Sequence, residues 1–394
     1  MTSEPIIAPA MWEKPDRSIG AAEIITTPSL TYWQDVRQRL WANKPAVVSI
    51  CFIVVLIFGA VFGPLISPFS YFEQNLRLSN IPPVFETYRV SDGAGEDTRF
   101  FLNASNFNLY QISEGGQVEG LLRGGRKDII KKSQSFEFGA TDIALDYSSR
   151  PARLLRADGT ELRPEGWQWN MTYLFGTDQL GRDVLVRQLY GARISLLVAF
   201  VATLVNFFIG IFYGGIAGYI GGKTDAVMMR IVEIISTIPL MLYVILLMVV
   251  LDSGLISIVV AIGSVFWVDM ARMVRGQILT LKQQDYVAAA RTMGAGTGRI
   301  LTRHLLPNSI GPILVTLTML IPSAIFIESF MSFIGLGVTP PMASWGTLTS
   351  EAVETMRAYP HQLFFPAAAI SLTMFAFNFL GDGLRDALDP RMRR

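Results

Sequence analysis

The chain has 394 residues, of which 51% are apolar and only 16% are charged. Soluble globular domains carry charge on roughly a quarter of their residues, so this composition is typical of a membrane protein. The net charge of +1 gives no reason to expect a nucleic-acid partner. One cysteine and two histidines are too few for a structural zinc site, and we expect no metal or cofactor in this chain.

Six apolar runs are long enough to be membrane spans, because a helix needs about 20 apolar residues to cross a bilayer. They lie at residues 46–66, 195–222, 234–251, 253–268, 305–327 and 362–381. The fourth run is expected to continue past Asp269 toward Arg272, and the fifth past Glu328 to about Gly335. The sequence therefore predicts an all-α polytopic membrane protein with six transmembrane helices.

Positive charge is distributed unevenly around these spans. Lysine and arginine flank them on the side that holds the N-terminus, whereas the two short loops on the other side contain only Arg357. The positive-inside rule then places both termini in the cytoplasm.

A long polar segment follows the first span. Residues 70–165 are mixed in charge, the stretch VFETYRV at 84–90 alternates, and Asp158-Gly159 is a two-residue hairpin signal. We expect a small, mostly β insert on the outer side of the membrane.

These features give a linear plan of the chain. Residues 1–44 are predicted to form a cytoplasmic N-terminal segment with an interfacial helix, and residues 45–67 the first transmembrane helix. The outer insert occupies residues 68–192, and a five-helix transmembrane core with a cytoplasmic loop at 276–307 occupies residues 193–384. Residues 385–394 form a cytoplasmic tail.

The stretch AGYIGGKT at 217–224 resembles a loose phosphate-binding loop. Such a loop follows a short strand, whereas here the preceding apolar run is long enough for a spanning helix. Glycines in the run suit close helix packing and a turn, and Lys223 falls at the cytoplasmic interface. We interpret the stretch as a helix end, so another chain must bind ATP if ATP is used.

The cytoplasmic segment 283–312 predicts two short helices joined by a turn. Asp285 can cap the first helix, Gly294 and Gly296 permit the turn, and Pro307 marks the start of the next span. This is either a rigid knob for a cytoplasmic partner or an ordinary amphipathic connector, and the physics alone favours neither.

Charged residues within spans are costly to insert and usually face protein or a water-filled path. The candidates for such a pathway or for a subunit interface are Glu233, Asp269, Arg272, Glu328 and Asp382. A structural role near a helix end is favoured for all but Glu328, and Asp269 and Arg272 can pair at i, i+3. For Glu328, deeper in its span, both interpretations stay open.

The cytoplasmic segment also resembles the EAA loop of ABC-importer permeases. In AAARTMG and the HLLP that follows, five residues match that pattern, whereas Ala288 replaces a glutamate and His304 an isoleucine. The resemblance implies that coupling to an ATPase involves Asp285, Tyr286, Ala288, Ala289, Ala290, Gly294, His304, Leu306 and Pro307.

Four further stretches resemble the C-type permeases of oligopeptide and dipeptide importers. They are FGTDQLGRDVLVRQLYGARISL, GYIGGKTDAVMMRIVEIISTIP, ESFMSFIGLGVTPPMASWGTL and GDGLRDALDPR, and the resemblance covers residues 30–66 and 170–394. It implies six transmembrane helices of the type I ABC-importer permease kind and a binding-protein-dependent importer with peptides as the expected solutes.

The same resemblance implies the partners. They are a second permease subunit, two ATPase subunits that bind ATP and Mg, an extracytoplasmic solute-binding protein and membrane lipid, while this chain itself is no enzyme. The alternative from another class is an ion-coupled secondary transporter for a small solute, although no inverted repeat is visible.

Overall fold

The computed structural model describes residues 31–389 apart from 92–96, 123, 126, 139–140, 149–151 and 253. The predicted N-terminal segment is therefore described from residue 31 on, where α1 (Tyr32–Ala42) is the expected short helix. The last five residues of the predicted tail, and the first residue of the fourth predicted span, lie outside the described residues.

Five helical segments among the described residues are long and apolar enough to cross a membrane. They are α2 (Lys44–Ile66), α3 (Val184–Ile220), the joined α6 (Leu255–Gly263) and α7 (Trp267–Leu281), α11 (Ile310–Phe333) and α13 (Pro360–Leu388). A sixth, formed by α4 (Gly222–Thr237) and α5 (Leu240–Leu251), is bent by 86° at its break. The prediction of a helical membrane protein with six spans is confirmed if this bent pair is one span.

Three details of the predicted spans are wrong: one span is broken, and two begin or end elsewhere. The third span, predicted as continuous, is broken at Ile238, because Pro239 disfavours the helical conformation in the residue before it. The fourth runs on to Leu281, well past Arg272. The second begins at Val184, so the outer segment ends at Asp183 and not at residue 192.

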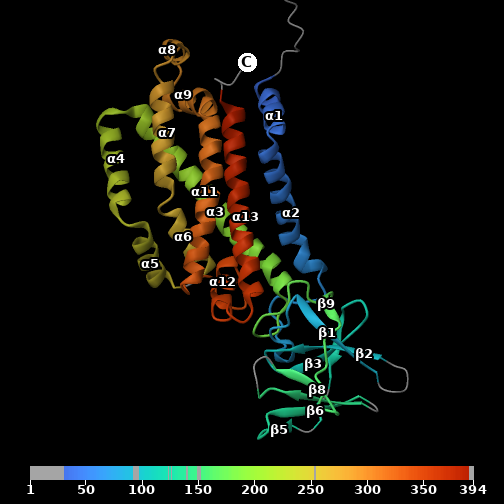
Figure 1. The fold of residues 1–394 in the computed structure, drawn as a ribbon. Coiled ribbons are helices and arrows are strands. Elements are labelled where there is room, and N and C mark those ends of the chain that lie inside the picture. The colour runs from blue at the N-terminus through green and yellow to red at the C-terminus, as the bar shows by residue number, and fades with distance from the viewer. Residues whose placement is uncertain are drawn as a thin grey trace, which may run out of the picture.

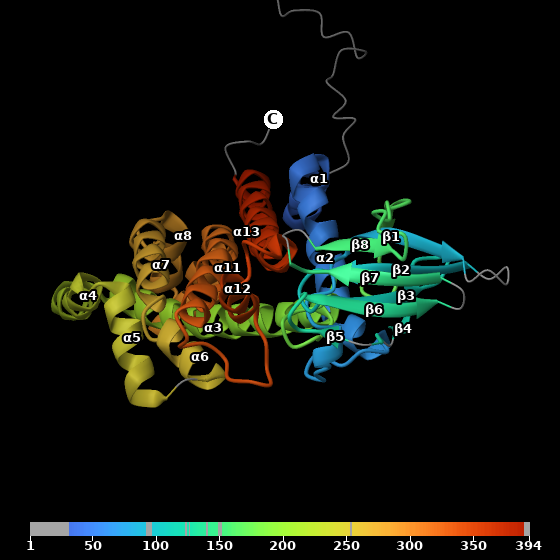
Figure 2. The same ribbon diagram turned by 60° about the horizontal axis from the view of Figure 1, so that its bottom comes forward.

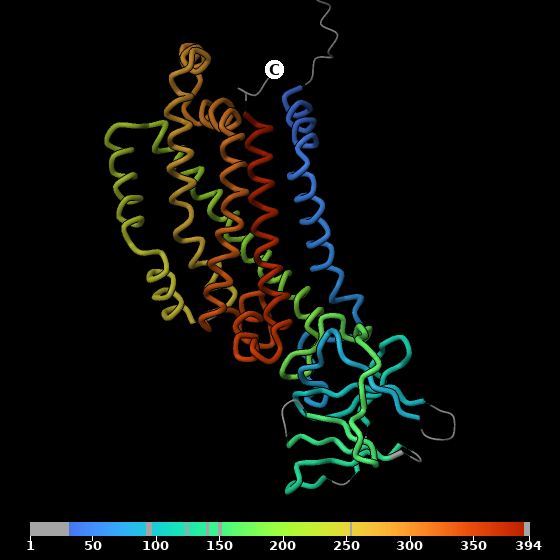
Figure 3. The backbone as a smooth tube through the Cα atoms, in the orientation of Figure 1, coloured from blue at the N-terminus to red at the C-terminus, as the bar shows by residue number. Residues whose placement is uncertain are grey.

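The helices form one bundle with different structures at its two ends (Figure 1). The short helices α8 (Asp285–Thr292) and α9 (Thr297–Ile300) lie at the same end as α1 and the end of α13. The β insert lies at the opposite end, below α2 and the start of α3, as the tube in Figure 3 also shows. The short helix α12 (Trp345–Val353) lies at that end too, between α11 and α13.

A seam of glycines on α3 lets α7 approach closely. A Cβ added to Gly214 would lie 2.2 Å from the carbonyl oxygen of Ala271, and one added to Gly218 would lie 2.9 Å from that of Arg275. Small residues of this kind allow membrane helices to pack backbone against backbone. Helix α3 then ends at Ile220, and Gly221 adopts a φ of +70°. The AGYIGGKT stretch is therefore a helix end, as predicted.

The insert consists of two antiparallel sheets that lie face to face (Figure 2). The first sheet has the strand order β4-β3-β2-β1-β9 and the second β5-β6-β7-β8. The strands are β1 (Val84–Ser91), β2 (Asp97–Asn103), β3 (Asn108–Ile112), β4 (Val118–Leu121), β5 (Lys127–Asp128), β6 (Ser133–Phe138), β7 (Thr141–Asp146), β8 (Arg153–Arg156) and β9 (Gly166–Trp169). The predicted β insert is confirmed.

Alternating side chains of the five-stranded sheet serve two cores. Phe100 packs between the sheets with Phe136 and Leu145, whereas the adjacent Phe101 packs on the outer face with Ile81. The hairpin predicted at Asp158-Gly159 is also present: the Gly159 N–H donates to the carbonyl of Arg156, with a φ of +82° at Gly159.

Candidate functional site

The loop after α7 folds back on itself as a helix, a turn and a second helical segment. Helix α8 ends at a turn where Gly294 has a φ of +80°. A helical stretch then runs through α9, a π-helical turn (Leu301–Leu305) and α10 (Leu306–Asn308). Gly296 has an ordinary φ of −69°, so only Gly294 needs the conformational freedom of glycine.

The predicted cap of α8 is displaced by one residue. Gln284 occupies the N-cap position, and Asp285 is the first helical residue, without a side-chain capping hydrogen bond. A carboxylate in the first turn still interacts favourably with the helix dipole.

Apolar contacts anchor this loop to the bundle. Val287 and Ala290 of α8 are buried, and so are Ile300 and Leu305 in the returning segment. The Asn308 side-chain amide lies 3.4 Å from the hydroxyl of Tyr286, which joins the two arms. Arg291 packs over the ring of Tyr219 at 5.4 Å. The loop is thus a structured knob at the end of the bundle.

The face of the knob that does not pack against the bundle is exposed. Ala288, Ala289 and Gly294 are exposed, and Met293 is 82% exposed. Small residues let a partner approach the helix backbone, and an exposed methionine adapts to varied apolar surfaces. The structure brings the nine predicted coupling residues together in this knob, and their roles remain predictions.

Glu328 is fully buried in the bundle. Its carboxylate accepts hydrogen bonds from the hydroxyls of Ser195 on α3 and Ser332 on α11, both at 2.8 Å. The Ser195 oxygen also accepts the backbone N–H of Trp345 in α12, at 3.2 Å. Glu328 therefore joins three helices within the subunit, and a role in the solute pathway remains a prediction.

The other charged candidates are exposed, and three of them take part in ion pairs. Glu233 lies 3.0 Å from Arg230, and Asp269 lies 3.7 Å from Arg272, the i, i+3 pair expected from the sequence. Asp382 is exposed on α13. Among the described residues, no hydrogen bond or ion pair links any of these side chains to Glu328.

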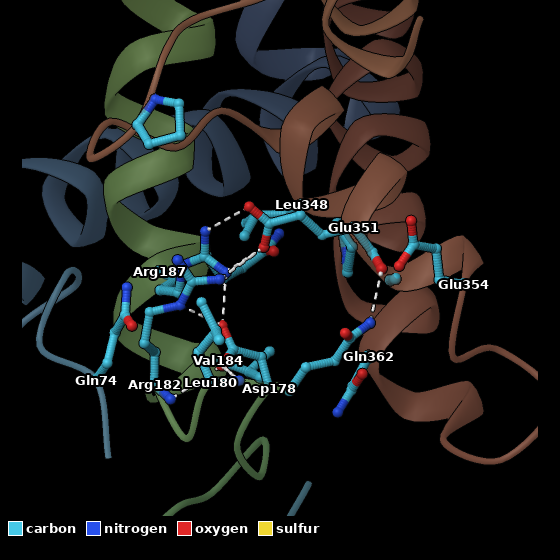
Figure 4. Close-up of a pocket in the computed structure, with 15 residues that line it drawn as sticks. Gln74, Asp178, Leu180, Arg182, Val184, Arg187, Leu348, Glu351, Glu354 and Gln362 are labelled. Carbon is cyan, nitrogen blue, oxygen red and sulfur yellow. Dashed lines mark hydrogen bonds and ion pairs between the residues drawn. The ribbon is translucent and has the colours of Figure 1, made fainter. Parts of the chain in front are cut away.

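An ion cluster at the end of the bundle next to the β insert was not predicted (Figure 4). Asp178 pairs with Arg182 at 2.6 Å and with Arg187 at 2.7 Å, and Glu351 of α12 lies 2.8 and 2.7 Å from the same two arginines. Arg187 is only 3% exposed. We call these four residues the insert-side ion cluster.

The insert-side ion cluster borders a cavity of about 400 Å³ and is connected to the insert. Gln362 of α13 donates to the carbonyl of Thr177 and to the side-chain oxygen of Asn80, both at 2.9 Å. The side-chain hydroxyl oxygen of Thr177 accepts the N–H of Ile81 at 2.8 Å. The segment before α3 thus contacts the base of the insert, α12 and α13 together. The sequence signal that could have indicated this cluster is the group of charged residues just before a long apolar run.

Five or six spans, a knob at one end and a β insert at the other define a multi-pass membrane protein. Residues 210–394 match the family described as binding-protein-dependent transport system inner membrane component. Residues 31–83 match the N-terminal TM domain of oligopeptide transport permease C.

Relatives agree with these matches. The oligopeptide transport system permease protein OppC of Bacillus subtilis is 38% identical over 98% of both chains, and the dipeptide permease DppC of that organism is 39% identical over 95% of this chain and 90% of its own. OppC of Escherichia coli is 49% identical over 56% of this chain and 73% of its own. The chain belongs to the C-type oligopeptide and dipeptide permease family.

The insert is shared with part of this family. The sequence resemblance left the insert at residues 70–165 without a counterpart, whereas the match to the B. subtilis OppC extends over nearly the whole chain and thus includes it. Among solved structures, a chain of the inward-facing MetNI methionine ABC transporter is 18% identical, with a TM-score of 0.42 over 52% of this chain and 96% of its own.

Proposed function

We propose that this chain is one of two membrane permease subunits of an ATP-driven, binding-protein-dependent importer whose solutes are peptides. The structured, exposed knob of α8 and α9 carries the proposal, because a subunit that binds no nucleotide needs a rigid contact with the chains that do. The relatives are oligopeptide and dipeptide transport permeases, which supports peptides as the solute class.

The remaining subunits follow from this assignment. A second permease would complete the translocation path, two ATPase subunits would bind ATP and Mg, and an extracytoplasmic solute-binding protein would deliver the peptide. The knob end of the bundle would face the cytoplasm of a bacterial or archaeal cell, with both termini on that side, as the distribution of positive charge predicts.

Coupling would run through the anchors of the knob. When ATP closes the ATPase pair, the push on α8 would reach α7 through the short connection 282–284 and α11 through α10. Because the knob is packed on the bundle through buried side chains such as Val287 and Leu305, the motion would be a rigid-body rotation of packed helices.

The first test is purification of the chain in mild detergent, with its neighbouring genes expressed, followed by an ATPase assay and peptide uptake into proteoliposomes. We expect ATPase chains and a second permease to co-purify, with ATPase activity stimulated by the binding protein and peptide. Recovery of the chain alone, with uptake driven by an ion gradient, would instead support a secondary transporter and reject the proposal.

A further inference from the structure

Two exposed tryptophans lie beside a carboxylate on one face of the five-stranded sheet. In the register of β1 with its edge neighbour β9 (Figure 1), Glu86 lies directly opposite Trp167, and Val84 lies directly opposite Trp169. Opposite side chains, and alternate side chains along a strand, share a face, so Glu86 and both tryptophans are on the same side of the sheet. The Cβ atoms of such neighbours are about 4.5–5.5 Å apart when opposite and about 7–8 Å apart on the diagonal, within reach of an indole ring.

This part of the face is open to solvent. Tyr88, the next residue of β1 on the same face, packs on the core between the two sheets, with its ring 5.9 Å from that of Phe100. Toward β9 the second sheet no longer covers the face, as the exposed fractions of 71% for Trp167 and 65% for Trp169 show. Glu86 lies between these two regions and is half-buried. We call Glu86, Tyr88, Trp167 and Trp169 the aromatic-acidic site.

The aromatic-acidic site carries a negative charge that no cation offsets among the described residues. The Tyr88 hydroxyl donates to Oε2 of Glu86 at 3.4 Å. The ion pairs within the described part of the insert use Asp97, Glu161 and Glu165 as their carboxylates, and Glu86 is in none of them. Burial raises the pKa of Tyr88 to about 12, and the charges of Glu86 and Glu161 add to the shift. A cation brought to this site would therefore find a carboxylate that is not already paired.

The side chains of this site suit an ammonium or guanidinium group. The face of an indole ring attracts a cation that lies within about 6 Å of its centre, and tryptophan does so more strongly than the other aromatic residues. A carboxylate adds a charge-assisted hydrogen bond, which is bidentate for a guanidinium group. Small ligands are usually enclosed by the protein that binds them, whereas these two indole rings are mostly exposed. The open arrangement therefore suits a basic side chain on the surface of another protein.

We propose that the aromatic-acidic site holds a lysine or arginine side chain of a protein that docks on the β insert. The partner is the extracytoplasmic solute-binding protein, an identification that rests on the proposed function. The insert lies at the end of the bundle opposite the knob, which is the side where that protein would deliver the peptide (Figure 1). Tryptophan, tyrosine and arginine are enriched among the residues that dominate the binding energy of protein interfaces.

The test measures the concentration of binding protein that gives half-maximal ATPase stimulation of the whole complex in nanodiscs. Glu86→Gln and Glu86→Lys remove or reverse the charge, Trp167→Ala removes one ring, and Trp167→Phe keeps a smaller ring. Glu137→Gln is the matched control for charge, because Glu137 is exposed on the face of β6 that points away from the core. Ile130→Ala is the control for exposed apolar area, because Ile130 is 95% exposed after β5. Thermal unfolding of each variant checks that it is folded.

We expect Glu86→Gln and Trp167→Ala each to raise the half-maximal concentration severalfold, with Trp167→Phe between Trp167→Ala and the wild type. Glu86→Lys should raise it about tenfold or more, because like charges then face each other across the interface. Both controls should leave it unchanged. Added salt should weaken the docking of the wild type more than that of Glu86→Gln, because salt screens an exposed ion pair.

Two results would overturn the proposal while leaving the proposed function in place. One is full stimulation with the same half-maximal concentration in every variant. The other is a changed preference for peptides with a basic residue at an unchanged half-maximal concentration, since the site would then bind the solute itself. A wild-type complex that no binding protein stimulates would instead reject the proposed function and this partner together.

Discussion

Arg187 of α3 and Glu351 of α12 form a two-point ion pair, with Nη1 to Oε2 at 2.7 Å and Nη2 to Oε1 at 3.1 Å. The arginine is 3% exposed, whereas the Glu351 side chain is 43% exposed. The pair therefore joins an immobile buried cation to a carboxylate that can reach solvent. If α12 moves away from α3 during transport, this contact has to open, together with the hydrogen bonds that Trp345 donates to Ser195 and Gln188.

Replacing Arg187 by methionine should destabilise the protein strongly. The change removes one of the two arginines that pair with the buried carboxylate of Asp178. Breaking a buried ion pair lowers the free energy of unfolding by about 3–5 kcal/mol. Glu351→Gln should cost less, because its side chain is partly exposed and screened by solvent. Thermal unfolding in detergent measures both. Glu354→Gln is the control, since Glu354 borders the same cavity but has no ion pair with the described residues; an equal loss for all three variants would contradict the prediction.

Removal of the Glu328 carboxylate should lower the stability of the fold, whether or not the carboxylate also acts in transport. Glu328→Ala leaves the hydroxyls of Ser195 and Ser332 without their acceptor, at a cost of about 1–3 kcal/mol. Glu328→Gln keeps one acceptor oxygen and should recover most of that stability. Unfolding curves and uptake assays on matched amounts of folded protein separate the two roles. Normal stability with lost uptake in Glu328→Gln would show that the carboxylate acts in transport, beyond its structural contacts.

The seam between α3 and α7 can be tested with two adjacent glycines. Gly214→Ala should be strongly destabilising, because its Cβ would lie 2.2 Å from a backbone oxygen of α7 and the helices would have to separate. Overpacking of this kind costs about 1–3 kcal/mol. Gly215→Ala should be neutral, since its nearest neighbour would be a Leu301 methyl at 3.7 Å. Similar melting temperatures for the two variants would argue against a close α3–α7 contact.

The coupling knob offers another adjacent pair. Ala288 and Ala289 are both exposed on α8, and the family pattern has glutamate at the position of Ala288. Ala288→Glu should therefore keep ATPase stimulation and uptake near the wild-type level. Ala289→Glu places a charge where a close contact is expected and should reduce both severalfold. Both are measured in the reconstituted complex; unchanged activity in the second variant would show that this face does not contact the ATPase.

Local sequence patterns predicted the spans, the β insert and the two short helices of the loop after α7. They left open whether that loop is a rigid knob or an ordinary connector, because its packing against the bundle is not a local property. The break before Pro239 was missed since the apolar run continues on both sides of it, and one proline does not interrupt hydropathy. The insert-side ion cluster was missed for another reason. Arg187 and Glu351 are far apart in sequence, and only the packing of α12 against α3 brings them together.

Asp183 should make stability depend on pH. Its carboxylate accepts the N–H of Val186 at 2.7 Å and caps α3, yet burial raises its pKa to about 6, with the nearby charge of Asp178 adding to the shift. In the unfolded chain the pKa of an aspartate is about 3.9. The folded state thus binds the proton more tightly, so this contribution to stability is fully present below about pH 4 and is lost as pH rises through 6.

Asp183→Asn keeps an acceptor for the cap but cannot ionise. The difference in melting temperature between wild type and Asp183→Asn, measured from pH 4 to pH 8, should therefore move in favour of the variant as pH rises. The change should be concentrated between about pH 4 and pH 6, the interval between the two pKa values. A constant difference over the whole range would show that the carboxylate has the same pKa in both states.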